Sequence, residues 1–356
     1  MKILHTSDLH LSSPLSTRLS GEKARLRRRE LSQTLSRLCE AARREGCKAM
    51  IIAGDLFDSE RVTKPALSSV LDTVRAEKNI SFYYLMGNHE GELILKSGEA
   101  LPENLFIFGE DWTSFSIGDV VISGRSSLCR GAFDSLNLDA SRKNIVVLHG
   151  ELRDTTDEGV IGMRDAKDKG IDYLALGHYH TYSETKIDER CLAVYSGTPE
   201  GRGFDELGEM GYAVIDTDKK GFAPRFVPFA KRNIWHIRVD ISSAMTQSEL
   251  FSLTDSAVYR LDRTSLVRLE LCGNYREGAW KSLEAIRARY EDAFFYFELC
   301  DSSKMAIDAE KLKYDKTLKG EFIRLVLSDD SISPEMRERI ISCGLYSLLG
   351  EAIYEE

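Results

Sequence analysis

The stretch AMIIAGDLFDS, residues 49–59, decides the fold class of this 356-residue chain. Its apolar run stops at Gly54 and is followed directly by Asp55. An apolar run bounded by glycine is typical of a buried strand in a parallel sheet. Ligands of open α/β folds bind just beyond the carboxyl ends of such strands, so Asp55 occupies an expected site position. The alternative is an aspartate that only caps the next helix.

The same pattern recurs along the chain, each time as an apolar strand that ends in a side chain able to bind metal. These side chains are Asp8, His10, Asp55, Asn88, His89, His149, His178 and His180. Five of the seven histidines lie at such strand ends. Because the carboxyl ends of parallel strands meet at one edge of a sheet, we expect a metal centre there.

In order, the motifs read D-x-H, G-D-x-x-D, G-N-H-E, H-G and G-H-x-H. This series resembles the calcineurin-like metallophosphoesterase superfamily over the first two thirds of the chain. The opening ILHTSDLHL and the run GDLFDS resemble the bacterial SbcD-type branch, the nuclease subunits of double-strand-break repair complexes. The resemblance implies an α/β fold: a two-layered β-sandwich flanked by helices, with a small α/β cap domain.

The resemblance also implies a role for each strand-end residue. The first metal ion is held by Asp8, His10 and His180, the second by Asn88, His149 and His178, and Asp55 bridges the two. His89 faces the substrate and stabilises or protonates the leaving oxygen, while Asp58 orients His89. Two divalent ions about 3.5–4 Å apart activate water and stabilise the charged transition state. Mn²⁺ is the expectation from the family, although nitrogen and oxygen donors also suit Fe and Zn²⁺.

A glycine-rich loop, YSGTPEGRGFDELGEMGY at residues 195–212, follows the last of these histidines. It resembles the loop in the same place in bacterial members of the nuclease branch. We hypothesise that Arg202 in this loop contacts a substrate phosphate. The alternative is a β-hairpin with good turn residues.

The alternation of strands and helices predicts three parts. Residues 1–232 form the dinuclear-metal phosphoesterase domain, residues 233–305 a small α/β cap domain, and residues 306–356 a C-terminal helical segment. Short alternating runs in residues 105–124 predict antiparallel hairpins, and helices are expected at 161–169, 317–327 and 334–349. His5 and His236 lie within predicted strands, which indicates structural roles.

Composition narrows the class of protein. With 42% hydrophobic and 29% charged residues, the chain is typical of a globular protein. Neither a membrane-length apolar stretch nor a signal-peptide pattern is present in the sequence, so we expect a cytoplasmic protein without membrane contact. Seven cysteines without a CxxC pair fit neither a disulfide framework nor a zinc knuckle.

The main hypothesis is a metal-dependent phosphodiesterase that hydrolyses DNA, as an SbcD-like exonuclease or endonuclease. The formal net charge of −9 instead favours the alternative, a small-molecule or nucleotide phosphoesterase that does not act on DNA. The Arg-rich stretch 18–44 offers a local basic patch, or only a solvated helix face. A binding scaffold on a degenerate site is disfavoured, because every expected ligand position is filled.

The resemblance implies two partners besides DNA: a second copy of the chain and an SMC-like ATPase of the SbcC type. We expect the helix at 65–78 to form a homodimer face and the two C-terminal helices to bind the ATPase. Packing within the chain is the alternative for both segments.

Overall fold

The computed structural model describes residues 1–13, 15, 19–58, 62–86, 99–129, 131–155, 157, 159–219, 222–276, 279, 281–307 and 309–349. The chain divides into two compact units. The first consists of Met1–His236, Asp262–Val267 and Ala293–Tyr296, and the second of Ile237–Leu261, Arg268–Asp292 and Phe297–Glu356. The three-part division at residues 232 and 305 stays a prediction.

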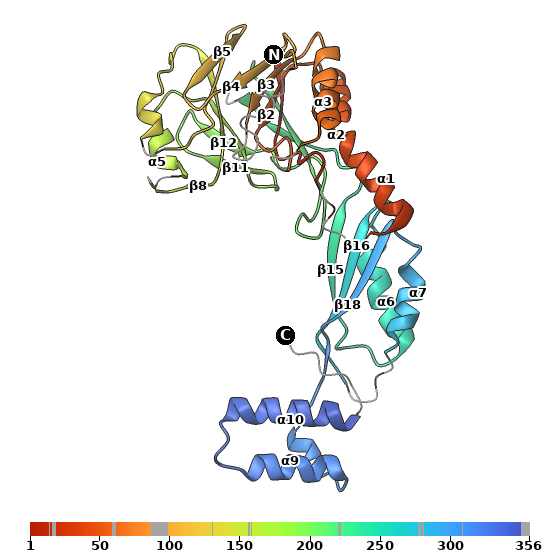
Figure 1. Ribbon diagram of the computed structural model, residues 1–356. Helices are drawn as coiled ribbons and strands as arrows, with labels where there is room; N and C mark the ends of the chain where they lie inside the picture. Colours follow the sequence, from red (N-terminus) through yellow and green to blue (C-terminus); the bar gives the residue numbers. More distant parts are fainter. Residues whose placement is uncertain are drawn as a thin grey trace. The chain divides into compact units, whose positions relative to one another are not determined.

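One sheet of the first unit has the strand order β14-β13-β1-β2-β3-β4. Its strands β2, β3 and β4 are labelled in Figure 1. Its strands are β1 (Lys2–Thr6), β2 (Cys47–Ala53), β3 (Ser81–Leu85), β4 (Leu105–Phe108), β13 (Gly211–Asp216) and β14 (Arg225–Pro228). Strands β1 to β4 are parallel, so their carboxyl ends lie along one edge. Strand β13 runs antiparallel to β1.

A second sheet has the order β11-β12-β10-β7-β6-β5. Its strands are β5 (Thr113–Ile117), β6 (Val120–Gly124), β7 (Lys143–His149), β10 (Tyr173–Gly177), β11 (Ser183–Lys186) and β12 (Leu192–Tyr195). The four inner strands are parallel, and β5 and β11 are antiparallel edges. This sheet therefore also gathers its strand ends at one edge.

The alternation of side chains along β2 explains how the layers pack. Ala49, Ile51 and Ala53 belong to the core shared with β7 and β10 of the other sheet, while Met50 and Ile52 pack with the helices. Alternate residues of a strand point to opposite faces, so both faces of this buried strand are covered. The chain has the predicted mixed α/β fold, with sheets flanked by helices.

Two helices cover the first sheet, α2 (Thr34–Glu45) and α3 (Lys64–Ala76), and α1 (Gly21–Ser32) precedes α2 along the chain. The side chain of Thr63 accepts a hydrogen bond from the backbone N–H of Ala66, and Pro65 occupies the first turn, which explains where α3 begins. Helix α2 ends where Gly46 takes a left-handed φ of 75°.

Two sequence-based expectations were wrong in detail. Residues 105–108 form no hairpin, because β4 pairs in parallel with β3; only β5 and β6 form the expected antiparallel hairpin. The helix expected at 161–169 is limited to α5 (Met163–Ala166), preceded by β9 (Ile161–Gly162), which pairs with β8 (Leu152–Arg153). A short 3₁₀ helix, η1, spans Ala132–Ser135.

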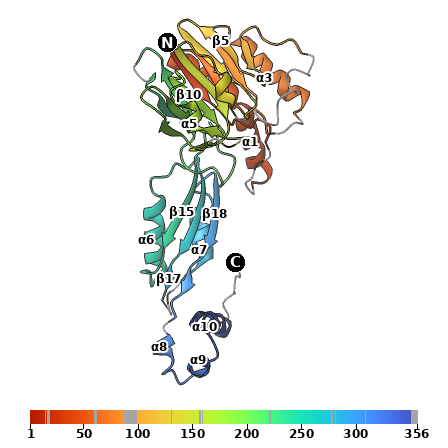
Figure 2. The same ribbon diagram turned by 90° about the vertical axis from the view of Figure 1, so that its left-hand side faces the viewer.

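Beyond residue 233, strands alternate again with helices, as predicted (Figure 2). The strands are β15 (Ile234–Asp240), β16 (Leu266–Cys272), β17 (Asn274–Tyr275), β18 (Tyr296–Asp301) and β19 (Lys304–Met305), and the helices are α6 (Gln247–Val258) and α7 (Leu283–Tyr290). Arg289 of α7 pairs with Asp255 of α6, so these two helices lie side by side. Thr246 and Glu249 form a capping box that fixes the start of α6.

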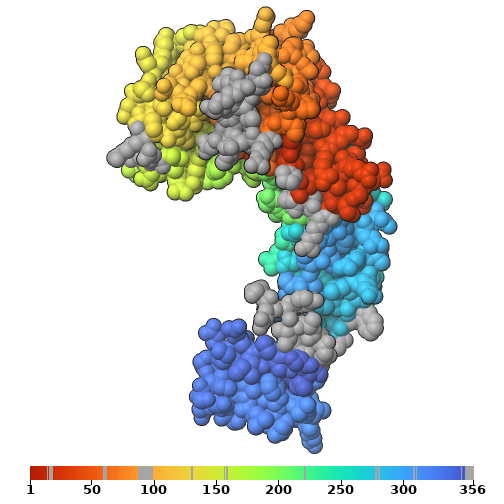
Figure 3. All heavy atoms as spheres, viewed as in Figure 1, coloured from red at the N-terminus to blue at the C-terminus, as the bar shows by residue number. Residues whose placement is uncertain are grey.

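The last described residues form α8 (Ala309–Leu312), α9 (Leu318–Ser328) and α10 (Pro334–Leu349). Ile323 and Val326 of α9 pack against Ile341 and Leu345 of α10, and both helices are blue in Figure 3. Across the part of the chain that the structure describes, no helix combines the length and apolar character needed to cross a membrane.

Candidate metal centre

The loops after β1 and β2 are held together by backbone hydrogen bonds. The N–H of Asp8 donates to the carbonyl of Gly54 at 3.1 Å, and the N–H of His10 donates to the carbonyl of Asp55 at 3.0 Å. Pairing between these two parallel strands thus continues past their formal ends. As a result, the D-x-H and G-D-x-x-D motifs lie next to each other.

The second sheet delivers its strand ends to the same place. The backbone N–H of His178, just after β10, donates to the carboxylate of Asp8 at 3.0 Å and 3.2 Å. His149 ends β7, and its Nδ1 lies 2.9 Å from the carbonyl oxygen of Ala53 in the first sheet. The candidate site therefore lies where the carboxyl ends of both sheets meet.

The backbone of the site is strained. Asp8, His10, Asp55 and His178 have φ values of 51°, 44°, 49° and 109°, in the region that L-residues rarely adopt. They make up half of the eight non-glycine residues with positive φ in the described parts of the chain. Such strain gathers at functional sites, where surrounding contacts hold side chains in place.

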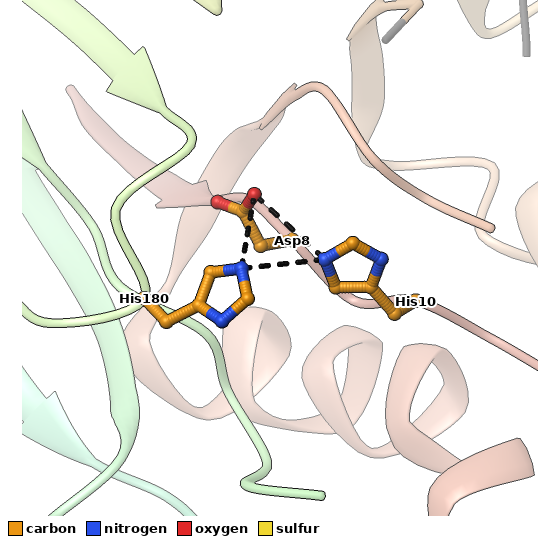
Figure 4. Close-up of side chains that lie close together, drawn as sticks. All are labelled: Asp8, His10 and His180. Atoms are coloured by element: carbon orange, nitrogen blue, oxygen red, sulfur yellow. Dashed lines mark hydrogen bonds and ion pairs between the residues drawn. The ribbon is translucent and has the colours of Figure 1, made fainter. Parts of the chain in front are cut away.

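The first group of candidate ligands is Asp8, His10 and His180 (Figure 4). The Nε2 atoms of His10 and His180 lie 3.4 Å apart, and Asp8 Oδ1 lies 4.0 Å and 3.7 Å from them. Tetrahedral ligands at bond lengths of about 2.0–2.1 Å are about 3.4 Å apart. These three side chains thus fit one divalent ion with small adjustments.

The second group is Asp8, Asp55 and His149. Asp55 Oδ2 lies 3.5 Å from His149 Nε2 and 3.9 Å from His10 Nε2, so this carboxylate faces both groups. Because the Ala53 carbonyl accepts a hydrogen bond from His149 Nδ1, the Nε2 lone pair is left for a cation. The bridging role of Asp55 stays a prediction.

Glycines let the two sheets approach closely at the site. A Cβ atom at Gly177 would lie 1.9 Å from the carbonyl oxygen of Ala53, and one at Gly54 would lie 2.1 Å from His149 Nδ1. Gly54 also has a φ of 91°, which glycine adopts without steric cost. The glycines of these two strand ends are therefore required by the packing of the metal centre.

Carboxylates lie behind both histidines of the first group. His180 Nδ1 lies 2.7 Å from Glu206 Oε1, and His10 Nδ1 lies 3.2 Å from Asp58 Oδ1, although the latter pair is poorly aligned for a hydrogen bond. Arg202 pairs with both Glu206 and Asp58. Sequence analysis did not identify Glu206, because a glutamate in a glycine-rich loop carries no distinguishing signal.

These contacts shift the pKa values of the groups involved. Burial by itself raises the pKa of Glu206, but hydrogen bonds from His180 and Arg202 bring it down to about 2. Burial lowers the pKa of His180, yet Glu206 and Asp8 outweigh it, so the pKa is raised. Burial and the charge of Arg202 lower the pKa of His10. Glu206 is therefore a carboxylate at neutral pH, able to accept the Nδ1 proton of His180.

The structure does not bring together every residue of the predicted site. Asn88 and His89 lie outside the described residues. His178 is exposed and belongs to neither group above, although its ring centroid lies 5.7 Å from that of His149. The predicted actions of Asp58 on His89 and of Arg202 on a substrate phosphate stay predictions.

The donor set fits divalent metal ions. Buried carboxylate oxygens and imidazole nitrogens converge, and two imidazole Nε2 atoms face each other at 3.4 Å, a contact that a shared cation would stabilise. When bound, such ions supply an activated water as nucleophile and stabilise the charged transition state of phosphoester hydrolysis. Asp8, His10, Asp55, His149 and His180 would hold these ions.

His5 occupies β1 but not the site. Its side chain is fully buried, and its Nδ1 lies 2.9 Å from the hydroxyl of Tyr173. Burial lowers its pKa to about 3, so the ring is neutral at physiological pH. This histidine is a core residue, as its place within a strand indicated.

Comparison with known proteins agrees with this geometry. The chain is 27% identical over 305 residues to the uncharacterized metallophosphoesterase YhaO of Bacillus subtilis (strain 168). This alignment covers 78% of this chain and 73% of that protein. It is 24% identical over 294 residues to the DNA double-strand break repair protein Mre11 of Methanosarcina acetivorans. That alignment covers 77% of this chain but 46% of the relative, so the chain spans less than half of its length.

Among solved structures, TT1561 of Thermus thermophilus is similar to this chain with a TM-score of 0.46 and 11% identity, over 64% of this chain and 98% of that one. The calcineurin-like phosphoesterase family matches residues 1–182, the part that holds Asp8, His10, Asp55, His149 and His180. Because this match spans more than half of the 356 residues, the chain belongs to the calcineurin-like phosphoesterase family and is a metallophosphoesterase.

Proposed function

We propose that this protein hydrolyses phosphodiester bonds of DNA, as an SbcD-type exonuclease or endonuclease in DNA repair. The reaction uses two divalent metal ions, and the expected ion is Mn²⁺. The observation that carries the proposal is the extent of the likeness to Mre11 of Methanosarcina acetivorans. It covers 77% of this chain, well beyond the residues 1–182 that the family model matches. The DNA substrate and the repair role come from that relative's name.

The chemistry assigned to the chain's own residues follows from the site. In the proposal, the carboxylates of Asp8 and Asp55 and the imidazoles of His10, His149 and His180 hold both cations before substrate binds. In the proposal, a DNA phosphodiester binds at this edge of the two sheets. In the proposal, His89 donates a proton to the leaving oxygen of the substrate.

Exposed cations of α1 support contact with a DNA backbone. Lys23, Arg25, Arg28 and Arg29 are exposed along α1. In contrast, Arg27 in the same helix is 1% exposed and pairs with Glu200. The predicted basic stretch therefore divides into cations that hold the fold and cations that remain available to phosphates.

The alternative is a phosphoesterase for small molecules or nucleotides that does not act on DNA. The net charge of −9 favours it, since DNA binding needs a local excess of cations. The Bacillus subtilis relative, which carries no stated substrate, is compatible with either function.

One experiment separates the two functions. End-labelled single- and double-stranded DNA is incubated with protein and Mn²⁺, beside bis(4-nitrophenyl) phosphate, with His89→Ala prepared in parallel to exclude contaminating nucleases. We expect wild-type protein to degrade DNA and the variant to lose this activity. Turnover of the small diester with DNA left intact would favour the alternative.

We further propose that the protein is a homodimer that uses α3. Leu67, Val70, Leu71 and Val74 of this helix are part of the core, so the dimer face would consist of the opposite side, with Ser69, Asp72 and Arg75. Light scattering tests this proposal, and a monomeric mass would refute it.

The partner we propose for α9 and α10 is an SMC-like ATPase of the SbcC type. These helices expose Leu318, Leu325, Met336 and Leu348, with exposed fractions of 68%, 63%, 49% and 42%. A partner that covered these apolar side chains would remove them from water, which favours association. Deletion of residues 317–356 should abolish capture of the purified ATPase, and undiminished capture would contradict the assignment.

A further inference from the structure

The glycine-rich loop places Glu206 directly behind a candidate metal ligand. Glu206 is almost completely buried, and its Oε1 lies 2.7 Å from His180 Nδ1. The same oxygen accepts hydrogen bonds from Arg202 Nε at 3.0 Å and from Arg202 Nη2 at 2.6 Å. A carboxylate on Nδ1 fixes both the tautomer and the ring orientation of a histidine that binds metal through Nε2.

Arg202 extends this arrangement to the second histidine of the same group. Its Nη1 donates to Asp58 Oδ1 at 3.0 Å, and this oxygen also lies 3.2 Å from His10 Nδ1. One guanidinium thus joins the carboxylates behind His10 and His180, whose Nε2 atoms are 3.4 Å apart. The planar fork of arginine suits such double pairing, which a lysine ammonium cannot reproduce.

The loop that carries these residues is itself anchored from inside the fold. Glu200, 2% exposed, accepts hydrogen bonds from Arg27 Nη2 at 2.9 Å and from the backbone N–H of Lys231 at 2.8 Å, and it also pairs with Arg37. Arg27 additionally donates to the carbonyl of Gly201 at 2.7 Å, next to Arg202. Buried ion pairs of this kind hold a loop in one conformation only when every partner is present.

We propose that Arg202, Glu206 and Asp58 are positioning residues that together fix the imidazoles of His10 and His180 for metal binding. The arrangement, a histidine clamp, acts through the two histidines and does not touch the substrate. The inference rests on the metal centre and is independent of whether DNA is the substrate.

The histidine clamp and a direct contact with a substrate phosphate are alternative roles for Arg202. The Arg202 side chain is 14% exposed, and its nitrogens already pair with two carboxylates. A phosphate contact would require at least one of these ion pairs to break. The two roles predict different measurements, because the clamp affects metal affinity and a phosphate contact affects the Michaelis constant for the diester.

Metal-free full-length protein is titrated with Mn²⁺, and free Mn²⁺ is followed by electron paramagnetic resonance. The variants are Arg202→Lys and the isosteric Glu206→Gln. The matched control is Arg190→Lys, which breaks a comparable arginine–carboxylate pair with Asp172 at the opposite ends of the strands. Hydrolysis of bis(4-nitrophenyl) phosphate is then measured over a range of Mn²⁺ concentrations, and melting in EDTA establishes that each variant is folded.

We expect both clamp variants to weaken binding of one Mn²⁺ ion by about 10–100-fold, with the control unchanged. Excess Mn²⁺ should restore turnover, and the Michaelis constant for the diester should stay at the wild-type value. Unchanged Mn²⁺ affinity with a raised Michaelis constant would overturn the clamp in favour of a phosphate contact. Equal loss of Mn²⁺ affinity in Arg190→Lys would also overturn it. Failure to cleave DNA has no bearing on these readouts.

Discussion

Replacing Gly54 by alanine tests whether glycine at this strand end is required for the metal centre. The added Cβ would lie 2.1 Å from Nδ1 of His149, 2.6 Å from its Cγ and 3.0 Å from its Cβ. Van der Waals contact between carbon and nitrogen needs about 3.5 Å. The imidazole therefore has to move by more than an ångström, and it loses its hydrogen bond to the Ala53 carbonyl.

The cost has two parts that can be measured separately. Alanine at a φ of 91° costs about 1–2 kcal/mol in backbone strain, and the lost hydrogen bond costs about 1 kcal/mol. We therefore expect a loss of about 2–3 kcal/mol in the free energy of unfolding, measured with urea. Misplacement of a reacting group by about 1 Å lowers rates by a factor on the order of 100, so diester hydrolysis in Mn²⁺ should fall by that factor.

Gly118→Ala is the matched control. Gly118 also has a positive φ, 60°, but an added Cβ meets no atom within 4 Å. In this variant, backbone strain alone should lower the free energy of unfolding, by about 1–2 kcal/mol. Its rate of hydrolysis should stay at the wild-type value. Wild-type hydrolysis by Gly54→Ala, or an equal loss in Gly118→Ala, would refute the argument that His149 and Gly54 are coupled.

Three further predictions concern stability. In the folded protein the pKa of His5 is about 3, below its ordinary value of 6.5, so between these values only the unfolded chain binds the proton. The free energy of unfolding therefore falls by about 1.4 kcal/mol per pH unit as the pH drops below 6.5. His5→Asn should flatten this slope in urea titrations, and an unchanged slope would contradict the assignment. Glu200→Gln removes one of the two carboxylates that pair with the buried Arg27, the other being Glu30. The lost charge-assisted hydrogen bond should lower the free energy of unfolding by about 1.5–3 kcal/mol, whereas a loss below about 0.5 kcal/mol would contradict a structural role of the pair. Mn²⁺ at 100 times its dissociation constant should raise the free energy of unfolding by about 2.7 kcal/mol. EDTA should remove this increase, and Asp8→Asn should largely abolish it. Equal stabilisation of the variant would mean that the ion binds elsewhere.

The parts of the fold predicted correctly are those in which local sequence and burial agree. The apolar run before Asp55 forms a strand with both faces covered, and the helix expected at 65–78 is observed as α3 (Lys64–Ala76). Residues 105–108 were assigned wrongly because alternation indicates a strand but not its partner. The parallel pairing of β4 with β3 depends on tertiary structure, and the local sequence of a strand does not indicate which strand it pairs with.

The candidate site shows the same division. Asp8, His10, Asp55, His149 and His180 each follow an apolar strand, so their convergence could be predicted from parallel topology. The contact of Glu206 with His180 could not be predicted in this way. Glu206 reaches His180 across 26 residues of chain, and its contact depends on a loop conformation held by buried ion pairs.

The most direct test of the central claim is the number of metal ions bound per chain. Metal-free protein is equilibrated with Mn²⁺, passed through a desalting column and analysed by inductively coupled plasma mass spectrometry, beside Asp55→Ala and the β15 variant His236→Gln. We predict two ions in the wild type and in His236→Gln, and fewer in Asp55→Ala, whose carboxylate faces both ligand groups. One ion or none in the wild type, or an undiminished content in Asp55→Ala, would contradict a dinuclear centre at the strand ends.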